Sequence, residues 1–131
     1  MDRRKFNQAA LKAGYSSGFE DETANYLRSK GVEFTYEGET FKWVDMKVRK
    51  YTPDFILANG IIIETKGRFM PNDRRKHVEI KKQHPHLDIR FVFYNSKVRI
   101  YKGAKSTYAD WCKRHGFLYS DKIIPDEWLK E

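Results

Sequence analysis

Two short apolar runs joined by a tight turn constrain the fold of this chain more than any other feature. They lie in the stretch YTPDFILANGIIIETKG, residues 51–67, with the turn at Ala58-Asn59-Gly60. An Asn-Gly turn between apolar runs predicts a β-hairpin. The run Ile61–Ile63 is typical of a central strand that is covered on both faces. We therefore expect this hairpin to lie in the interior of a sheet.

The length of the turn decides which face of the hairpin its charged residues occupy. A two-residue loop would leave Asp54 and Glu64 on opposite faces. A three-residue loop, with Gly60 in the left-handed conformation, sets Asp54 directly opposite Glu64, with their Cβ atoms about 5 Å apart. Lys66 is two residues beyond Glu64 and so projects from the same face. We prefer the second register, which brings two carboxylates and an ammonium group together.

Two carboxylates at that separation repel, and each raises the pKa of the other once they are desolvated, unless a cation lies between them. Mg²⁺ prefers oxygen ligands, typically one or two carboxylates with waters and substrate phosphate oxygens. The ammonium of Lys66 could orient an attacking water or stabilise charge on a phosphate. The structural alternative is a turn acid at Asp54 and a salt bridge from Glu64 to Lys66, which contributes only roughly 0–1 kcal/mol when exposed. Because the charges end a strand of the central type, we prefer a metal site that acts on a phosphodiester.

The rest of the sequence predicts helices and strands around the hairpin. In chain order they are a helix over 17–31, a strand over 32–37, a helix over 72–84, two strands over 87–103, a helix over 106–116 and a last helical turn near Pro125. Residues 38–50 are ambiguous, because they fit either an irregular strand or an extended connector. Residues 1–15 are expected to form a mobile basic arm. Together these elements predict a single mixed α/β domain over residues 1–131.

The chain carries a formal net charge of +8, from 26 basic and 18 acidic side chains. Such a surplus favours a polyanionic partner, because each phosphate that a cation neutralises releases counterions. Nucleic acid is preferred over a membrane surface, since no basic cluster lies on a clearly amphipathic helix.

The setting expected from the sequence is the cytoplasm. No apolar run approaches the roughly 18 residues that a membrane-spanning helix needs, and the first residues lack the apolar segment of a secretory signal. Cys112 is the only cysteine, so a disulfide within the chain is impossible and a reducing compartment fits. The histidines and Cys112 lack the paired spacing of a structural zinc site. His77, in a basic segment, is expected to touch phosphate or solvent instead.

Glu20 has two interpretations from its neighbours alone. Ser17 and Glu20 have the spacing of a capping box, in which Glu20 would bond back to the Ser17 amide. A helix N-terminus can also hold an acid above a neighbouring sheet edge. The spacing alone favours the cap.

Several segments, in order along the chain, carry a wider resemblance. They are SGFEDE, YTPDF, NGIIIETKG, DRRKH, QHPHLDIR, YKG and IIPDEWLKE. From about Ser16 to the C-terminus the chain resembles the endonuclease I family, the Holliday-junction resolvases of T-seven-type phages within the PD-(D/E)XK nuclease superfamily. The resemblance implies a restriction-endonuclease-like fold and a metal-dependent, structure-selective endodeoxyribonuclease that hydrolyses four-way DNA junctions. Two alternatives stay open: a related nuclease for another structure, such as a mismatch, flap or transposon end, and a DNA-binding module without activity.

The same resemblance assigns roles to individual residues. It implies that the catalytic residues are Glu20, Asp54, Glu64 and Lys66. Asp54, Glu64 and Glu20 would hold Mg²⁺ or Mn²⁺, and Lys66 would lie near the attacking water. The cytoplasm would then be that of an infected bacterial host.

The resemblance also implies an intertwined homodimer, in which two chains exchange the N-terminal helix and first strand. Residues 38–50 would be the connector, although they lack the prolines that can stiffen such a bridge. Each site would combine Glu20 of one chain with the hairpin residues of the other. A two-fold dimer suits a four-way junction, which has two equivalent strands to cut. We expect basic side chains to contact the DNA backbone, at Lys47, Arg49, Lys50, Arg74, Arg75 and Lys76.

Overall fold

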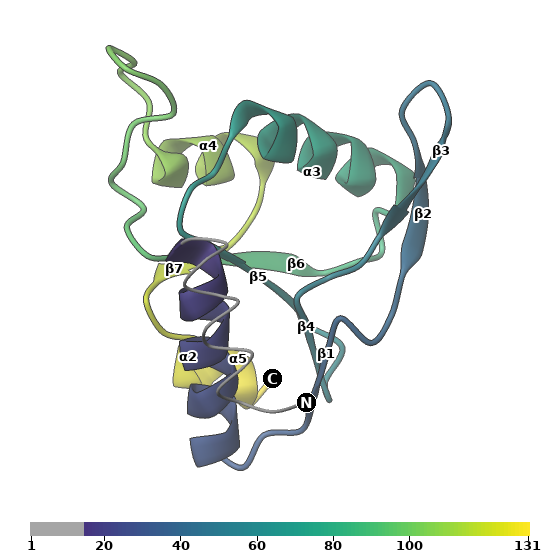
Figure 1. Cartoon of the computed structure of the whole chain (residues 1–131), viewed down its shortest axis with the longest axis vertical. Helices are drawn as coiled ribbons and strands as arrows, with labels where there is room; N and C mark the ends of the chain where they lie inside the picture. The colour runs from purple at the N-terminus through teal and green to yellow at the C-terminus, as the bar shows by residue number, and fades with distance from the viewer. Residues whose placement is uncertain (1–14) are drawn as a thin grey trace.

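A mixed five-stranded sheet forms the centre of the molecule, in the order β1-β4-β5-β6-β7 (Figure 1). A computed structural model describes residues 15–131, so the arm predicted over residues 1–15 lies outside the described residues except for its last position. The strands are β1 (Phe34–Tyr36), β4 (Phe55–Leu57), β5 (Ile62–Lys66), β6 (Ile89–Phe93) and β7 (Tyr119–Asp121). β1, β4 and β5 are antiparallel neighbours, whereas β5, β6 and β7 run parallel. The predicted α/β fold with a mixed sheet is confirmed.

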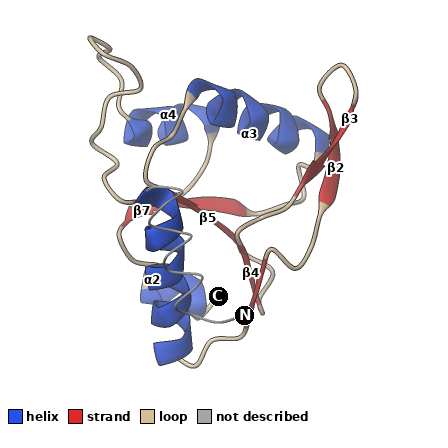
Figure 2. Cartoon of the chain, in the orientation of Figure 1, coloured by secondary structure: helices blue, strands red, loops and turns tan. Residues whose placement is uncertain are grey.

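Helices cover both faces of this sheet (Figure 2). They are α2 (Tyr15–Ser29), α3 (Pro71–Gln83), α4 (Tyr108–His115) and α5 (Asp126–Leu129). α3 and α4 join parallel strands, which need such crossover connections, and they pack on the face that bears Ile62 and Phe91. α2 and α5 pack on the opposite face, against Ile63 and Val92. Successive residues of β5 thus enter two different cores, which explains its unbroken apolar run.

The β4–β5 hairpin has the predicted three-residue loop. The N–H of Leu57 donates to the carbonyl of Ile61 across the loop at 2.9 Å, and Gly60 has a left-handed φ of 89°. The same register, continued toward the strand ends, sets Asp54 opposite Glu64. The predicted pairing is therefore confirmed.

Residues 38–50, which the sequence left ambiguous, fold largely into a second hairpin. Its antiparallel strands are β2 (Phe41–Val44) and β3 (Val48–Tyr51), which form a separate two-stranded sheet. Trp43 and Tyr51 are buried in the core beneath α3. The side chain of Gln83, at the end of α3, bonds both the N–H and the carbonyl of Val44, at 2.6 and 2.8 Å. These contacts with α3 are distant in the sequence, so local patterning could not reveal the hairpin.

Two predicted local features are wrong. Where a second strand was predicted within residues 87–103, only an isolated bridge between Arg99 and Thr107 forms. The position beside β6 is occupied by β7 instead, which the sequence did not predict. Ser17 lies inside α2, which contains Tyr15, so Ser17 is not the cap of that helix.

In the part of the chain that is described, no helix combines the length and apolar character that crossing a membrane demands.

Candidate active site

Glu64 is the most deeply buried of the predicted site residues, with 3% of its surface exposed. Its carboxylate accepts the backbone N–H of Asp54 at 2.9 Å and lies 3.3 Å from Nε2 of His77 in α3. Burial raises the pKa of Glu64 to about 8; the charge of Asp54 adds to this rise and that of Lys66 opposes it. Burial makes this carboxyl group costly to ionise, and a bound cation would stabilise its ionised form.

Asp54 lies where the chain enters β4, and Thr65 holds its carboxylate. The backbone N–H and the hydroxyl of Thr65 both donate to Oδ2, at 3.0 and 3.1 Å. Burial raises the pKa of Asp54, although Lys66 and the two Thr65 bonds lower it. Each carboxylate of the pair Asp54 and Glu64 therefore accepts a backbone N–H from the opposite strand. The hairpin register fixes both side chains at once.

Lys66 ends β5 with its ammonium group among acids. Nζ lies 3.8 Å from Oε1 of Glu64 and 3.7 Å from Oδ1 of Asp73. Burial alone would lower the pKa of Lys66, but the surrounding carboxylates, Glu64 and Asp73 first, raise it above its usual value. Lys66 therefore stays protonated near neutral pH, which suits charge stabilisation better than proton abstraction.

Helix α2 brings Glu20 to Asp54. Tyr36 donates its hydroxyl to Oε2 of Glu20 at 2.7 Å. Burial, followed by the charge of Asp54, raises the pKa of Glu20 to about 7. Carboxylate oxygens of Glu20, Glu37 and Asp54 all lie within 4.8 Å of one another. Because Ser17 is inside the helix, the capping interpretation of Glu20 is wrong.

Glu37 is a member of the site that the sequence did not reveal. It follows β1, has a left-handed φ of 50°, and donates its N–H to the carbonyl of Asp54 at 2.9 Å. Its side chain is exposed, whereas Glu20 and Asp54 are half-buried. Glu64 is not in this tight group, since its carboxylate lies deeper, beside α3. The site therefore has an open side, where three acids converge, and a buried side at Glu64.

His77 is fully buried, so the predicted contact with phosphate or solvent is wrong. Its ring lies among aromatic rings, with centroids 5.0 Å from Phe91 and 5.6 Å from Tyr51. Burial lowers the pKa of His77 well below its usual value, and nearby lysines lower it further. His77 and Ile80 are the buried residues of α3, and their spacing places them on one helix face. That spacing was the signal that could have found His77.

The comparison with known proteins identifies the family. A family model described as phage endonuclease I matches residues 1–131. This chain belongs to the phage endonuclease I family. Endonuclease I of Escherichia phage T7 is 47% identical over 118 residues, which cover 89% of this chain and 79% of the relative. Endodeoxyribonuclease 1 of Enterobacteria phage T3 is 48% identical over 118 residues, which cover 89% of this chain and 78% of the relative.

The oxygen donors of this endonuclease I family member suit a hard divalent cation. Mg²⁺ and Mn²⁺ prefer carboxylate oxygens, and Glu20, Glu37 and Asp54 offer them within one small volume. The pKa values of Glu20, Asp54 and Glu64 are all raised, in each case chiefly by burial. A divalent cation would favour the ionised form of these groups. The residues present therefore fit Mg²⁺ or Mn²⁺.

The basic residues that were predicted to contact DNA differ in the contacts that they make within the protein. Lys47 and Lys50 are exposed, and neither forms an ion pair with a described residue. Arg49 and Arg75 both bind Asp45, at 3.4 and 2.9 Å. Asp45 thus ties the tip of the β2–β3 hairpin to α3 and shares its charge between two arginines.

The other two basic residues brace the structure near Glu64. Arg74 donates to the carbonyl of Phe69, and the ammonium of Lys76 lies 5.4 Å from the ring centre of Tyr51. Both side chains are half-buried. Lys76 also lowers the pKa of Glu64, so it belongs electrostatically to the site.

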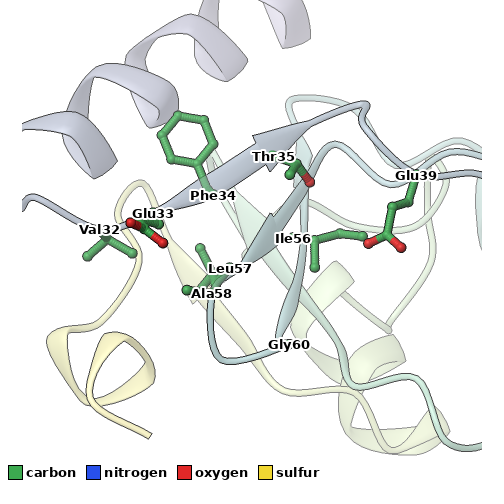
Figure 3. A pocket seen from close by; sticks show the side chains of 9 residues that line it. All are labelled: Val32, Glu33, Phe34, Thr35, Glu39, Ile56, Leu57, Ala58 and Gly60. Atoms are coloured by element: carbon green, nitrogen blue, oxygen red, sulfur yellow. The ribbon is translucent and has the colours of Figure 1, made fainter.

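A hollow beside the paired strands β1 and β4 is lined by residues other than these acids (Figure 3). The labelled side chains come from the two strands and the loops beside them, and none of the predicted catalytic residues lines it. Its charged lining residues are Glu33 and Glu39. Because both are acidic, this hollow is unsuited to phosphate.

Proposed function

We propose that this chain is a metal-dependent, structure-selective endodeoxyribonuclease that cuts branched DNA, with four-way junctions as its substrate. The observation that carries the proposal is the convergence of Glu20 from α2, Asp54 at the start of β4, and Glu64 with Lys66 from β5. Hydrolysis of a phosphodiester needs neutralisation of charge and a positioned water. The names of the T7 and T3 relatives, endonuclease I and endodeoxyribonuclease 1, support a nuclease.

In this proposal Asp54, Glu20 and Glu64 hold Mg²⁺, with Mn²⁺ as a substitute, and Glu37 is close enough to Asp54 to join them. The cation, when bound, would lower the pKa of a water and neutralise charge on the phosphate. Lys66, held protonated by its acidic neighbours, stabilises the negative charge that develops on the phosphate oxygens.

Other side chains keep these groups in place. Tyr36 holds Glu20, and Thr65 holds Asp54, each through a hydrogen bond to the carboxylate. The predicted phosphate-contacting side chains are those of Lys47, Arg49, Lys50, Arg74, Arg75 and Lys76. Such contacts position the backbone and carry no base identity, which suits recognition of a branched shape.

We further propose that two chains act as a homodimer that exchanges α2 and β1. Within the one chain described, Glu20 already reaches Asp54. Exchange between two chains would recreate the same contact at each of two symmetric sites. The phage origin of the T7 and T3 relatives supports the cytoplasm of an infected bacterium as the place of action.

Cleavage of a synthetic four-way junction tests this function. We expect cutting in Mg²⁺ or Mn²⁺, none with chelator, and much slower cutting of a linear duplex with the sequence of one arm. Glu64→Gln should bind the junction and leave it intact, because a neutral amide is a much weaker metal ligand than a carboxylate. A wild-type protein that binds but never cuts would be a DNA-binding module. Equal cutting of junction and duplex would exclude selectivity for branched DNA.

A further inference from the structure

The loop between β6 and α4 carries a concentrated positive charge that the site does not use. Its residues 97–106 project beyond the body of the molecule, in green at the upper left of Figure 1. They contain no acid, and four of their side chains are exposed cations: Lys97, Arg99, Lys102 and Lys105.

None of these four cations forms an ion pair with another described residue. Elsewhere on the surface, lysines form ion pairs with acidic side chains: Lys30 binds Asp126 at 3.1 Å and Lys82 binds Glu79 at 3.3 Å. Like charges that are gathered without acids repel one another, and a polyanion relieves that repulsion.

The protein holds the base and the turn of this loop in place. Both the N–H and the hydroxyl of Ser96 donate to the carboxylate of Asp121 in β7, at 2.6 and 2.8 Å. The N–H of Ile100 donates to the carbonyl of Ser106 at 3.0 Å, closing the loop. Ala104 is 3% exposed, so the loop has its own small buried contact. A loop that is already ordered loses less conformational entropy when it binds.

The loop starts at the edge of the sheet where the site lies. Lys66 pairs with Phe93 across the parallel strands, and the N–H of Tyr94 donates to the carbonyl of Lys66 at 3.0 Å. The ring of Tyr94 contacts that of Phe19, the residue before Glu20, at a centroid distance of 6.0 Å. The chain leaving this edge therefore departs from the immediate neighbourhood of the catalytic residues.

Chain length bounds how far the first cation can lie from Lys66. Lys97 is four residues beyond Phe93, and an extended chain covers at most roughly 3.6 Å per residue, or about 14 Å from Phe93. Phe93 pairs with Lys66 across one strand spacing of about 5 Å, which gives about 19 Å in all. Phosphates along one DNA strand are spaced by about 3.4 Å of helix axis. The loop therefore begins within about six nucleotides of a phosphate held at Lys66.

We propose that the 97–106 loop is a second phosphate-contacting surface, which grips the DNA backbone a few nucleotides from the bond to be cut. The proposal rests on the function proposed above. It adds a contact region beyond the β2–β3 hairpin and α3, and its cations act by charge, without reading bases.

The test compares the double variant Lys102→Gln/Lys105→Gln with a matched control, Lys30→Gln/Lys130→Gln, which removes the same charge just beyond the C-terminal ends of α2 and α5. Binding of a fluorescent four-way junction is measured in chelator over a series of salt concentrations. Each lost phosphate contact should reduce the slope of log K against log salt by about 0.9. We expect the loop variant to lose about 1 to 2 from that slope and the control to keep the wild-type slope. Lys102→Arg/Lys105→Arg should restore it.

The possible results distinguish failure of the loop proposal from failure of the proposed function on which it rests. If wild-type protein neither binds nor cuts junctions in Mg²⁺, the proposed function fails. If wild-type protein does both and the loop variant keeps the wild-type slope and affinity, only the loop proposal is overturned. Lys102 and Lys105 are exposed and form no ion pair with a described residue, so the melting temperature of the loop variant should match that of wild type, which excludes misfolding as the cause. The control loses the exposed ion pair of Lys30 with Asp126, so its melting temperature should fall slightly.

Discussion

Nε2 of His77 lies 3.3 Å from Oε1 of Glu64, and the His77 side chain has no exposed surface. Nδ1 of His77 has no hydrogen-bond partner among the described residues. A proton on Nδ1 would leave a buried donor unsatisfied and would turn the Nε2 lone pair toward a carboxylate. The neutral ring therefore carries its proton on Nε2 and donates it to Glu64. This bond orients the one acid of the site that is wholly enclosed.

His77→Leu should lower the cleavage rate by about 10- to 100-fold, because an outer partner that orients a metal ligand contributes on that scale. His77→Gln should recover most of the rate, since its amide nitrogen can donate from nearly the position of Nε2. Junction affinity should stay at the wild-type value in both variants. Single-turnover cleavage measures the rate, junction binding in chelator measures the DNA affinity, and Mn²⁺ calorimetry measures the metal affinity. If the substitutions only reduce stability, both variants should melt at a lower temperature and have the same metal affinity. A Leu variant that cuts at the wild-type rate would contradict the proposed role of His77 in orienting Glu64.

The metal-free protein should lose stability as the pH rises from about 5 to about 8. The pKa of Glu64 is raised from 4.5 to about 8 in the folded state and that of Glu20 to about 7, so in this window both carboxyl groups hold more protons in the folded chain than in the unfolded chain. The lowered pKa of His77 acts in the opposite direction below about 6.5, but it is one group against two. The free energy of unfolding then falls with increasing pH. Glu64→Gln removes one of the two carboxyl groups and should flatten the decline, as should Mg²⁺ added to wild type. Melting temperatures in chelator across this range test the sign; a wild-type melting temperature that rises over the same window would refute it.

Glu37→Gln should weaken Mn²⁺ binding by about 10-fold in the absence of DNA, an effect of the size expected for a lost contact worth about 1.4 kcal/mol. The reason is the approach of the Glu37, Glu20 and Asp54 oxygens to within 4.8 Å. Glu39→Gln is the matched control, because Glu39 is an exposed acid two positions away that lies outside this group. Calorimetric titration measures both. Equal affinities for the two variants would remove Glu37 from the site.

The parts of the site that follow from the sequence are those fixed by short-range rules. The register of Asp54 and Glu64 depends only on a three-residue loop and on the left-handed Gly60, both of which local sequence encodes. Glu37 depends instead on the pairing of β1 with β4, which joins segments some twenty residues apart. No local pattern records that contact.

The same distinction explains the errors in the fold. Residues 97–100 alternate as a strand would, but β5 and β7 occupy the two positions beside β6, so the segment cannot pair with the strand that precedes it. The basic composition of α3 concealed His77, although the buried face of that helix is set by its packing and not by its average charge. The average composition of a helix therefore does not show which of its residues is buried.

The tip of the β2–β3 hairpin has features that favour exchange between two chains. Met46 has a left-handed φ of 60°, which is strained for a residue with a side chain. Val44, Met46 and Val48 expose 53%, 102% and 64% of their surfaces. Opening this loop into an extended connector would relieve the strain and allow the apolar side chains to be covered by a second chain. The exchange proposed above is therefore compatible with a closed hairpin in the single chain.

Mixing two inactive variants tests that exchange directly. Glu20→Gln and Glu64→Gln chains are unfolded, combined in equal amounts and refolded together. If each site takes Glu20 from one chain and Glu64 from the other, a mixed dimer has one site with both acids intact. Random pairing makes about half of the dimers mixed, so about a quarter of all sites should work. The product should be a junction nicked in one strand, because the second site of each mixed dimer lacks both acids.

Either variant refolded alone should be inactive, and sedimentation should show a dimer. If the mixture is as inactive as its components, each site is built from a single chain, as Glu20 and Asp54 are arranged within the described one.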